Sequence, residues 1–205
     1  MLISILNYGM GNIRSVQNAL NYIGVENQVI TSTSQILESE KLILPGVGSF
    51  RLAMENIKKK KLIDPLNEVV LKKKTPVLGI CLGMQLMAEE SEEDGITKGL
   101  GWIKGPIKKF PAEKLKLKVP HVGFNEVFFE KNNKQLYKNL GEKADYYFVH
   151  SYRIPYDDCG CISGWSEYGE KFVASVEKDN IFGTQFHPEK SQSNGLIMLK
   201  NFAKL

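Results

Sequence analysis

The stretch GICLGMQ, residues 79–85, places a cysteine between two glycines where a strand pattern changes to a helix pattern. Residues 76–80 predict a short buried strand, and residues 82–90 predict a helix. The G-x-C-x-G spacing is that of a nucleophile elbow, in which Cys81 points out from the top of a sheet. The glycines leave the sulfur uncrowded, and a helix N-terminus favours the thiolate. The pattern therefore predicts a sulfur nucleophile, with a buried core cysteine as the alternative.

Strand and helix patterns alternate on both sides of this stretch. Strands are predicted at residues 2–6, 25–31 and 41–44, and helices at residues 12–24, 50–60 and 62–74. From Trp102 onward, strands are expected at residues 119–129, 146–149, 160–165, 172–176 and 181–186, before a final helix at 193–203. Alternation of this kind builds a parallel sheet with helices on both faces. We therefore expect one α/β domain over residues 1–205, largely parallel, with an antiparallel second half.

The composition is that of an ordinary globular protein. The chain has 205 residues, of which 42% are hydrophobic and 24% charged, enough for one sizeable domain. The net charge of +4 comes from lysine runs such as 58–61 and 72–74. These runs lack aromatic neighbours and close helix patterns, which indicates solvated helix faces rather than a nucleic-acid surface. Without a membrane-length apolar run or a signal peptide, we expect a cytoplasmic protein without membrane contact.

The three cysteines do not suggest a disulfide framework, because the count is odd and the chain carries no secretion signal. Cys159-Gly160-Cys161 could indicate metal or redox chemistry, but it has no second pair, and we interpret it as incidental.

A thiol nucleophile needs a base, and the chain has three histidines: His121, His150 and His187. His187 follows a predicted buried strand and stands two residues before Glu189, with Pro188 between them. In an extended segment residues i and i+2 lie on the same side, so Glu189 can hold one ring nitrogen while the other faces the sulfur. His121 and His150 have no carboxylate placed in this way, and we expect them to be structural or substrate-side residues.

Acyl transfer also needs donors for a developing oxyanion. The backbone N–H of Leu82 is one candidate, and the loop Pro45-Gly46-Val47-Gly48 at the end of another strand is a second. Neither this loop nor Gly9-Met10-Gly11 has the residues of a phosphate or dinucleotide motif. We expect no cofactor and no metal.

Together these motifs resemble the class I (triad) glutamine amidotransferases. The segments that carry the resemblance are residues 45–48, 79–85 and 187–189. More narrowly, the segments 8–12, 119–123, 148–152 and 187–191 resemble those of the glutaminase subunits of imidazole glycerol phosphate synthases. The resemblance covers essentially the whole chain. It implies a flavodoxin-like sheet and the hydrolysis of glutamine to glutamate and ammonia.

The resemblance also implies roles for particular residues. Cys81 would form a glutamyl thioester, with His187 as acid and base and Glu189 as its orienter. The remaining implied roles are glutamine binding by Gln85, Ser151 and Tyr152, oxyanion stabilisation by Gly46, Val47 and Gly48, and partner contact by Asn12, Phe124, Tyr147 and Lys190. The implied partner is a (β/α)8-barrel cyclase that takes up the ammonia for histidine biosynthesis and forms a heterodimer with this chain.

One position departs from the resemblance. The family usually has Gly-Trp-Asn where this chain has Gly123-Phe124-Asn125. A related branch pairs with a different cyclase-like barrel and supplies ammonia for the amidation of bacterial surface sugars, and Phe124 leaves that branch open. A stand-alone Cys-His-Glu hydrolase or peptidase on the same fold, which needs no partner, is an alternative from another class. A binding module without enzymatic activity would leave the three motifs unexplained.

Overall fold

A nine-stranded sheet forms the centre of the computed structural model, which describes residues 2–130 and 135–205. Its strands are β1 (Ile3–Leu6), β2 (Asn27–Ile30), β3 (Leu42–Gly46), β4 (Val77–Cys81), β8 (His121–Phe129), β9 (Lys143–His150), β11 (Ile162–Glu167), β12 (Lys171–Lys178) and β13 (Ile181–Thr184). Their order is β2-β1-β3-β4-β13-β12-β11-β8-β9. The first five are parallel and the remaining pairs antiparallel. This confirms the predicted α/β class and its antiparallel second half.

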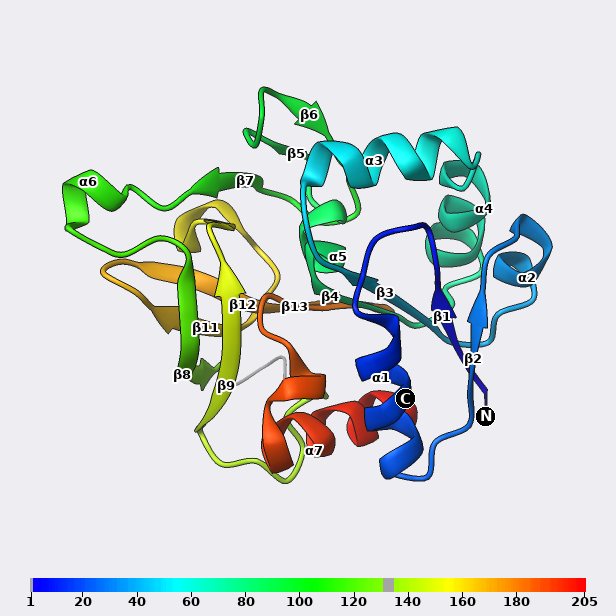
Figure 1. Ribbon diagram of the computed structural model, residues 1–205. Helices are drawn as coiled ribbons and strands as arrows, with labels where there is room; N and C mark the ends of the chain where they lie inside the picture. Colours follow the sequence, from blue (N-terminus) through cyan, green and yellow to red (C-terminus); the bar gives the residue numbers. More distant parts are fainter. Residues whose placement is uncertain (1, 131–134) are drawn as a thin grey trace.

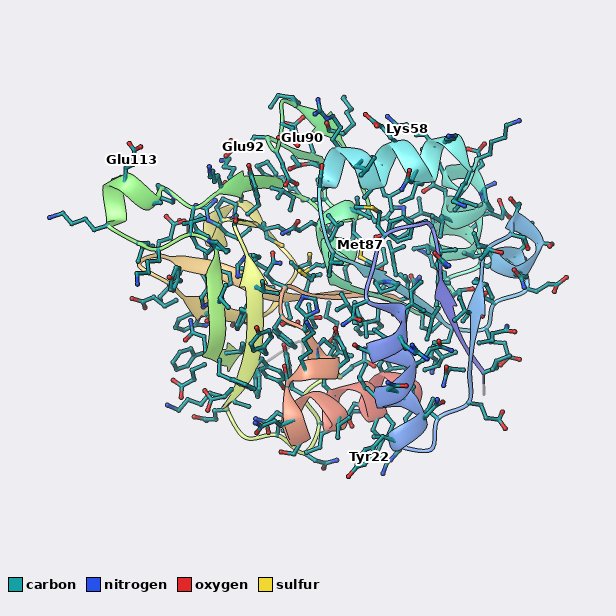
Figure 2. All side chains as sticks on the ribbon, in the orientation of Figure 1. Tyr22, Lys58, Met87, Glu90, Glu92 and Glu113 are labelled. Atoms are coloured by element: carbon teal, nitrogen blue, oxygen red, sulfur yellow. The ribbon has the colours of Figure 1, made fainter. Side chains whose placement is uncertain are left out.

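Helices pack on both faces of the parallel part (Figure 1). The helices are α1 (Ile13–Tyr22), α2 (Thr33–Leu37), α3 (Phe50–Lys59), α4 (Ile63–Asn67), α5 (Leu82–Leu86), α6 (Ala112–Leu115) and α7 (Gln192–Ala203). Of these, α6 lies apart from the parallel strands, beyond β7. α1 and α7 cover one face, and α3, α4 and α5 cover the other. Met87 is buried between α5 and the sheet, whereas Lys58 on α3 and Tyr22 on α1 point outward (Figure 2). Within the described residues, no helix could span a membrane.

The chain after the cysteine differs from the sequence prediction. The helix expected over residues 82–90 ends at Leu86, because the carbonyls of Leu86 and Met87 accept hydrogen bonds from Leu100 and Trp102. A second sheet follows in the order β10-β7-β5-β6, which the sequence did not reveal. Its strands are β5 (Glu90–Ser91), β6 (Thr97–Lys98), β7 (Pro106–Lys109) and β10 (Tyr152–Arg153). These strands have two to four residues, too few for a periodic pattern to show.

Two predicted helices also differ in detail. The helix expected over residues 62–74 divides into α4 and a π-helical turn, Glu68–Lys72, after which the Lys73 N–H bonds to the Glu68 carbonyl five residues back. Asn12 stands at the N-cap of α1 as predicted, but its side chain accepts a hydrogen bond from the Ser15 hydroxyl instead of capping the backbone. Short 3-10 turns cover Tyr156–Asp158 and Pro188–Lys190.

The strand register brings three chain segments to one edge of the sheet. β3, β4 and β13 are buried neighbours, with Gly46 paired to Cys81 and Ile80 paired to Thr184. All three strands run in the same direction, so the segments that leave their carboxyl ends lie side by side. This is the edge at which open α/β sheets bind ligands.

Candidate active site

Cys81 occupies a strained turn between β4 and α5. Its φ of 52° and ψ of −108° lie in a region that residues other than glycine rarely adopt. The flanking glycines are needed because a Cβ at Gly83 would lie 1.7 Å from the Leu44 carbonyl oxygen, and one at Gly79 would lie 2.7 Å from the Met84 nitrogen. Cys81 is only 6% exposed, and it lines a cavity at the sheet edge. The structure therefore has the elbow geometry that the G-x-C-x-G spacing predicts.

His187 and Glu189 form a buried pair beside this cysteine. Nδ1 of His187 lies 2.8 Å from Oε1 of Glu189, and each side chain is 1% exposed. The ring's position is fixed from the backbone, because the His187 N–H donates to the Tyr147 carbonyl and the His187 carbonyl accepts from the Ser191 hydroxyl. Nε2 is buried and has no hydrogen-bond partner among the described residues, so it is free to act toward the sulfur.

The surroundings of His187 keep its ring protonated. Burial alone would lower its pKa, but Cys81 and Glu189 outweigh burial and raise the pKa of His187 to about 10. A ring with this pKa is an imidazolium at neutral pH. The arrangement can therefore donate a proton to a leaving group on an acyl carbon attacked by the Cys81 sulfur.

A cavity of about 400 Å³ lies over the cysteine. Its lining residues are Val47, Gly48, Cys81, Leu82, Gln85, Glu93, Pro120, Val149, His150, Ser151 and Tyr152. The structure thus brings together the three residues expected to bind glutamine, Leu82, and two of the three expected oxyanion residues. A volume of this size suits a small metabolite.

Gly46 is the oxyanion residue that does not reach the cavity wall. It is buried, and a Cβ on it would lie 2.5 Å from the Tyr8 hydroxyl and 2.8 Å from Cβ of Leu82. The Tyr8 hydroxyl also donates to the Pro45 carbonyl at 2.7 Å. Val47, by contrast, is 40% exposed, so this loop is clamped on its inner side only.

Three of the four residues expected at a partner interface form one surface group, in which Tyr147 is half-buried and Phe124 and Lys190 are exposed. The rings of Phe124 and Tyr147 lie 5.6 Å apart, and Nζ of Lys190 lies 5.7 Å from the centre of the Tyr147 ring. Phe124 is 50% exposed, which is unusual for a large apolar side chain. Among the described residues, no hydrogen bond or ring contact joins Asn12 to this group.

Sequence reasoning missed two residues of the site. Glu93 lines the cavity, and its Oε2 accepts a hydrogen bond from the Phe50 N–H at 2.7 Å; burial raises the pKa of its carboxyl group. Gln185 is fully buried, with Nε2 3.7 Å from the Cys81 sulfur. The acidic side chains within residues 89–94 were a signal for Glu93, but only Glu89 and Glu90 entered the prediction, as the end of a helix. Nothing in the sequence pattern marked Gln185.

Cys159 and Cys161 lie away from the cavity. Both are free and buried, and their sulfur atoms are 3.4 Å apart. Within the described ranges, no group of three or more potential metal ligands occurs.

The elbow cysteine, the buried His-Glu pair and the parallel sheet define a class: enzymes that transfer acyl groups through a thiol. A family model for class-I glutamine amidotransferases matches residues 4–205, and the chain belongs to this family.

Its relatives point to a particular member of that family. The chain is 48% identical to "Imidazole glycerol phosphate synthase subunit HisH 1" of Campylobacter jejuni and 43% identical to subunit HisH of Leptospira interrogans, with 100% of both chains covered in each case. Among solved structures, PurLQS from Thermotoga maritima matches with a TM-score of 0.71 at 19% identity, covering 99% of this chain and 97% of that one. A further crystal structure of a glutamine amidotransferase matches with a TM-score of 0.74 at 16% identity, covering 99% of each chain. At these identities the structural likeness supports the fold alone.

Proposed function

We propose that this chain is the glutaminase subunit of an imidazole glycerol phosphate synthase. It hydrolyses glutamine and passes the ammonia to a (β/α)8-barrel cyclase subunit, in the cytoplasm, for histidine biosynthesis. The observation that carries the chemistry is Cys81 at an elbow beside the buried His187–Glu189 pair. Full-length identities of 41% to 48% to proteins named as subunits of this synthase support the pathway. In this proposal the whole chain is one amidotransferase domain.

The reaction follows from the position of each group. The Cys81 sulfur attacks the side-chain carbonyl carbon of glutamine, and the C–N bond breaks as His187 gives its proton to the amide nitrogen, which leaves as ammonia. A glutamyl thioester remains. His187 then takes a proton from water, the hydroxide attacks the thioester carbon, and glutamate leaves as the sulfur is restored. Glu189 holds the imidazole ring in orientation and stabilises its charged form throughout.

The cavity offers complementary groups to glutamine. The Gln85 amide donates both Nε2 protons, to the Tyr152 carbonyl and to Gln185, each at 3.0 Å. Its Oε1 makes no hydrogen bond with a described residue and is left to accept one from the substrate. The Glu93 carboxylate lines the same cavity and is suited to the α-ammonium group.

Oxyanion stabilisation is assigned to backbone groups that also border the cavity. The N–H of Leu82 follows the nucleophile directly, and the loop at Val47 and Gly48 borders the cavity. Gly48 has a φ of 109°, which a glycine adopts without strain. A peptide next to such a residue has two accessible orientations, so the second oxyanion donor can be absent until the loop turns.

The surface group of Phe124, Tyr147 and Lys190 is the proposed contact with the cyclase, and Asn12 is proposed as a further contact. Phe124 replaces the tryptophan usual in the family, which leaves a second candidate function: supply of ammonia to a cyclase-like partner for the amidation of surface sugars. Glutaminase chemistry would be the same in both. A stand-alone hydrolase is less well supported, because the relatives that match over the full chain are named as subunits.

Replacement of the nucleophile tests the proposed chemistry. Cys81→Ala should fold and bind the cyclase but lose glutaminase turnover by at least about 10⁴-fold, as removal of a triad nucleophile does. The complex should still make product from added ammonium, which shows that the cyclase is intact. Retained hydrolysis of glutamine in this variant would contradict the assignment.

Comparison of the free chain with the complex tests the proposed partnership. We expect the chain alone to be nearly silent, and turnover to rise roughly 100- to 1000-fold with the cyclase and its ligand, the range that one oxyanion donor contributes. The partner can produce this shift only if it binds the active orientation of the loop better. Equal turnover of the chain alone, with partner, and with partner and ligand would exclude this gating and leave the triad intact.

A further inference from the structure

His121 and His150 form a hydrogen-bonded pair that the proposed mechanism does not use. Nδ1 of His121 lies 3.1 Å from Nε2 of His150 across the β8–β9 ladder, where the two residues are register partners. They are 3% and 6% exposed. Each ring has a further polar neighbour on its other nitrogen, and these two neighbours decide where the protons are.

Asn125 fixes the proton of His121 from one end. Its Oδ1 accepts the Glu126 N–H at 2.8 Å, and its Nδ2 donates to the Glu167 carbonyl at 2.9 Å, which sets the orientation of the amide. The same Nδ2 faces Nε2 of His121 at 3.3 Å. An amide nitrogen can only donate. Nε2 of His121 is therefore the acceptor, and the proton of the neutral ring is on Nδ1, directed at His150.

The Tyr152 carbonyl fixes the proton of His150 from the other end. It lies 2.8 Å from Nδ1 of His150, and a carbonyl oxygen can only accept. The proton of this ring is therefore also on Nδ1, and Nε2 is the acceptor that the His121 N–H requires. Asn125 and the Tyr152 carbonyl stand at the two ends of this series of hydrogen bonds. Each independently requires the same pair of tautomers.

Aromatic rings hold the pair in place and keep it neutral. His121 is stacked between Tyr168 and Phe148, with ring centres 4.1 and 4.9 Å away. Phe172 packs against both histidines. Burial lowers the pKa of His121 to about 4 and that of His150 to about 3, so neither ring is charged near neutral pH.

The hydrogen bonds continue from this pair into the glutamine cavity. The Tyr152 carbonyl accepts a hydrogen bond from Nδ1 of His150 and a second one from Nε2 of Gln85. The second Nε2 proton of Gln85 goes to Gln185, whose own amide nitrogen faces the Cys81 sulfur at 3.7 Å. Each bond in this series has a defined donor and acceptor, from Asn125 to the sulfur.

We propose that His121 and His150 are positioning residues for glutamine binding, held in the Nδ1–H tautomer so that a one-way hydrogen-bond chain from Asn125 fixes the Tyr152 carbonyl and, through it, the Gln85 amide. Because Gln85 is assigned as a glutamine ligand, the proposal rests on the proposed function. It adds that the affinity for glutamine depends on two rings, of which His121 lies behind the cavity wall. This hydrogen-bond chain also joins the cavity to β8, the strand that carries the exposed Phe124.

Nitrogen NMR of the imidazole rings tests the tautomers directly. In the full-length chain near pH 7, protonated and unprotonated ring nitrogens give separate ¹⁵N signals, and both His121 and His150 should carry their proton on Nδ1. His187, assigned by its loss in His187→Ala, should show both nitrogens protonated. An Nε2–H tautomer or a charged ring at either His121 or His150 would overturn the proposal. This readout does not depend on glutaminase activity, so it can fail while the proposed function stands.

Steady-state kinetics of His121→Phe test the positioning role. Phenylalanine keeps a flat ring between Tyr168 and Phe148 but has no nitrogen to donate. With the cyclase and its ligand present, KM for glutamine should rise about tenfold, as for one lost hydrogen bond, while kcat changes by less than about twofold. Tyr168→Phe is the matched control, because it keeps the stack and removes a hydroxyl that donates only to the Lys118 carbonyl; its KM should be unchanged.

An unchanged KM in His121→Phe, or an equal rise in Tyr168→Phe, would contradict the positioning role. If His121→Phe does not fold, the ring nitrogens of the wild-type chain still decide the tautomers.

Discussion

His187 is buried against Cys81 and His150 is buried in the wall of the cavity, yet their pKa values are shifted in opposite directions. His187 is 1% exposed and His150 is 6% exposed. Burial lowers the pKa of both, but the pKa of His187 is raised to about 10 by Cys81 and Glu189, whereas that of His150 falls to about 3. The difference shows that burial alone does not set the charge of a histidine. Its charge also depends on the groups in contact with the ring, which for His187 are Cys81 and the carboxylate of Glu189.

The charged state of His187 also favours the neutral state of His150. The positive charge of His187 is one of the causes that lower the pKa of His150, after burial. A charged ring at the sulfur thus favours a neutral ring at His150, in the cavity wall. The charged histidine can move a proton, and the neutral pair can transmit hydrogen-bond direction without taking part in the proton transfer.

The largest effect on glutaminase turnover is expected when the charged ring of His187, or the carboxylate beside it, is removed. His187→Ala removes the acid and base together and should lower turnover by at least about 10⁴-fold. Glu189→Gln keeps a group that can hold the ring but stabilises the imidazolium poorly, so its loss should be smaller, roughly 10²- to 10⁴-fold. Turnover in the complex measures both.

The same Glu189→Gln variant should make His187 resemble His150. Without the carboxylate the pKa of His187 should fall from about 10, which an NMR titration of the ring would record. Activity near wild type in His187→Ala would assign the base to another residue.

The fold, the elbow at Cys81 and the pairing of His187 with Glu189 could be predicted from the sequence because each depends on local patterns. Apolar runs of four to six residues mark the buried strands, and the glycines beside Cys81 mark the elbow. His187 and Glu189 are two residues apart, so their pairing needed no knowledge of the rest of the chain.

The remaining features of the site depend on contacts that a sequence does not display. Gln185 and Gln85 meet although they are 100 positions apart, and His121 meets His150 through strand register. Glu93 reaches the cavity only because α5 ends early and the chain turns back as β5. The inner clamp of Tyr8 on Pro45 is likewise a contact between separate strand ends.

A carboxylate introduced beside the neutral pair tests whether such a group decides the charge of a buried histidine. In Asn125→Asp a carboxylate replaces the amide 3.3 Å from Nε2 of His121. The pKa of His121 should rise from about 4 by at least about two units, because the carboxylate favours the charged ring. A charged His121 still donates from Nδ1 to His150, so KM for glutamine should change less than in His121→Phe.

The control for this variant is Asn125→Ala, which removes the same amide without adding a charge. Its His121 should keep a low pKa in the same NMR titration. The two groups that face the new side chain most closely, the Glu167 carbonyl and the Glu126 N–H, are shared by both variants. A low pKa of His121 in Asn125→Asp would show that the carboxylate does not decide the charge.

The smallest effect concerns stability against pH. An unfolded histidine has a pKa of about 6.5. The folded His121 has a pKa of about 4, so between these values the unfolded chain binds a proton that the folded chain does not. Stability therefore falls as the pH drops through this window. His187 has the opposite sign: its pKa of about 10 gives a contribution that is complete below pH 6.5 and is lost progressively as the pH rises from 6.5 to about 10.

In His121→Phe the unfolded chain no longer binds the proton of His121 at acidic pH. The contribution of His187 at alkaline pH is unchanged. The free energy of unfolding, measured in urea between pH 7 and pH 5, should decline less steeply in this variant than in wild type. The difference in slope is at most about 1.4 kcal/mol per pH unit, the limit for one proton. Tyr168→Phe keeps His121 and should retain the wild-type slope, whatever its overall stability. Since only the slope depends on the number of protons bound, parallel curves for wild type and His121→Phe would mean that His121 is not held neutral in the folded chain, and the contrast with His187 would then rest on His150 alone.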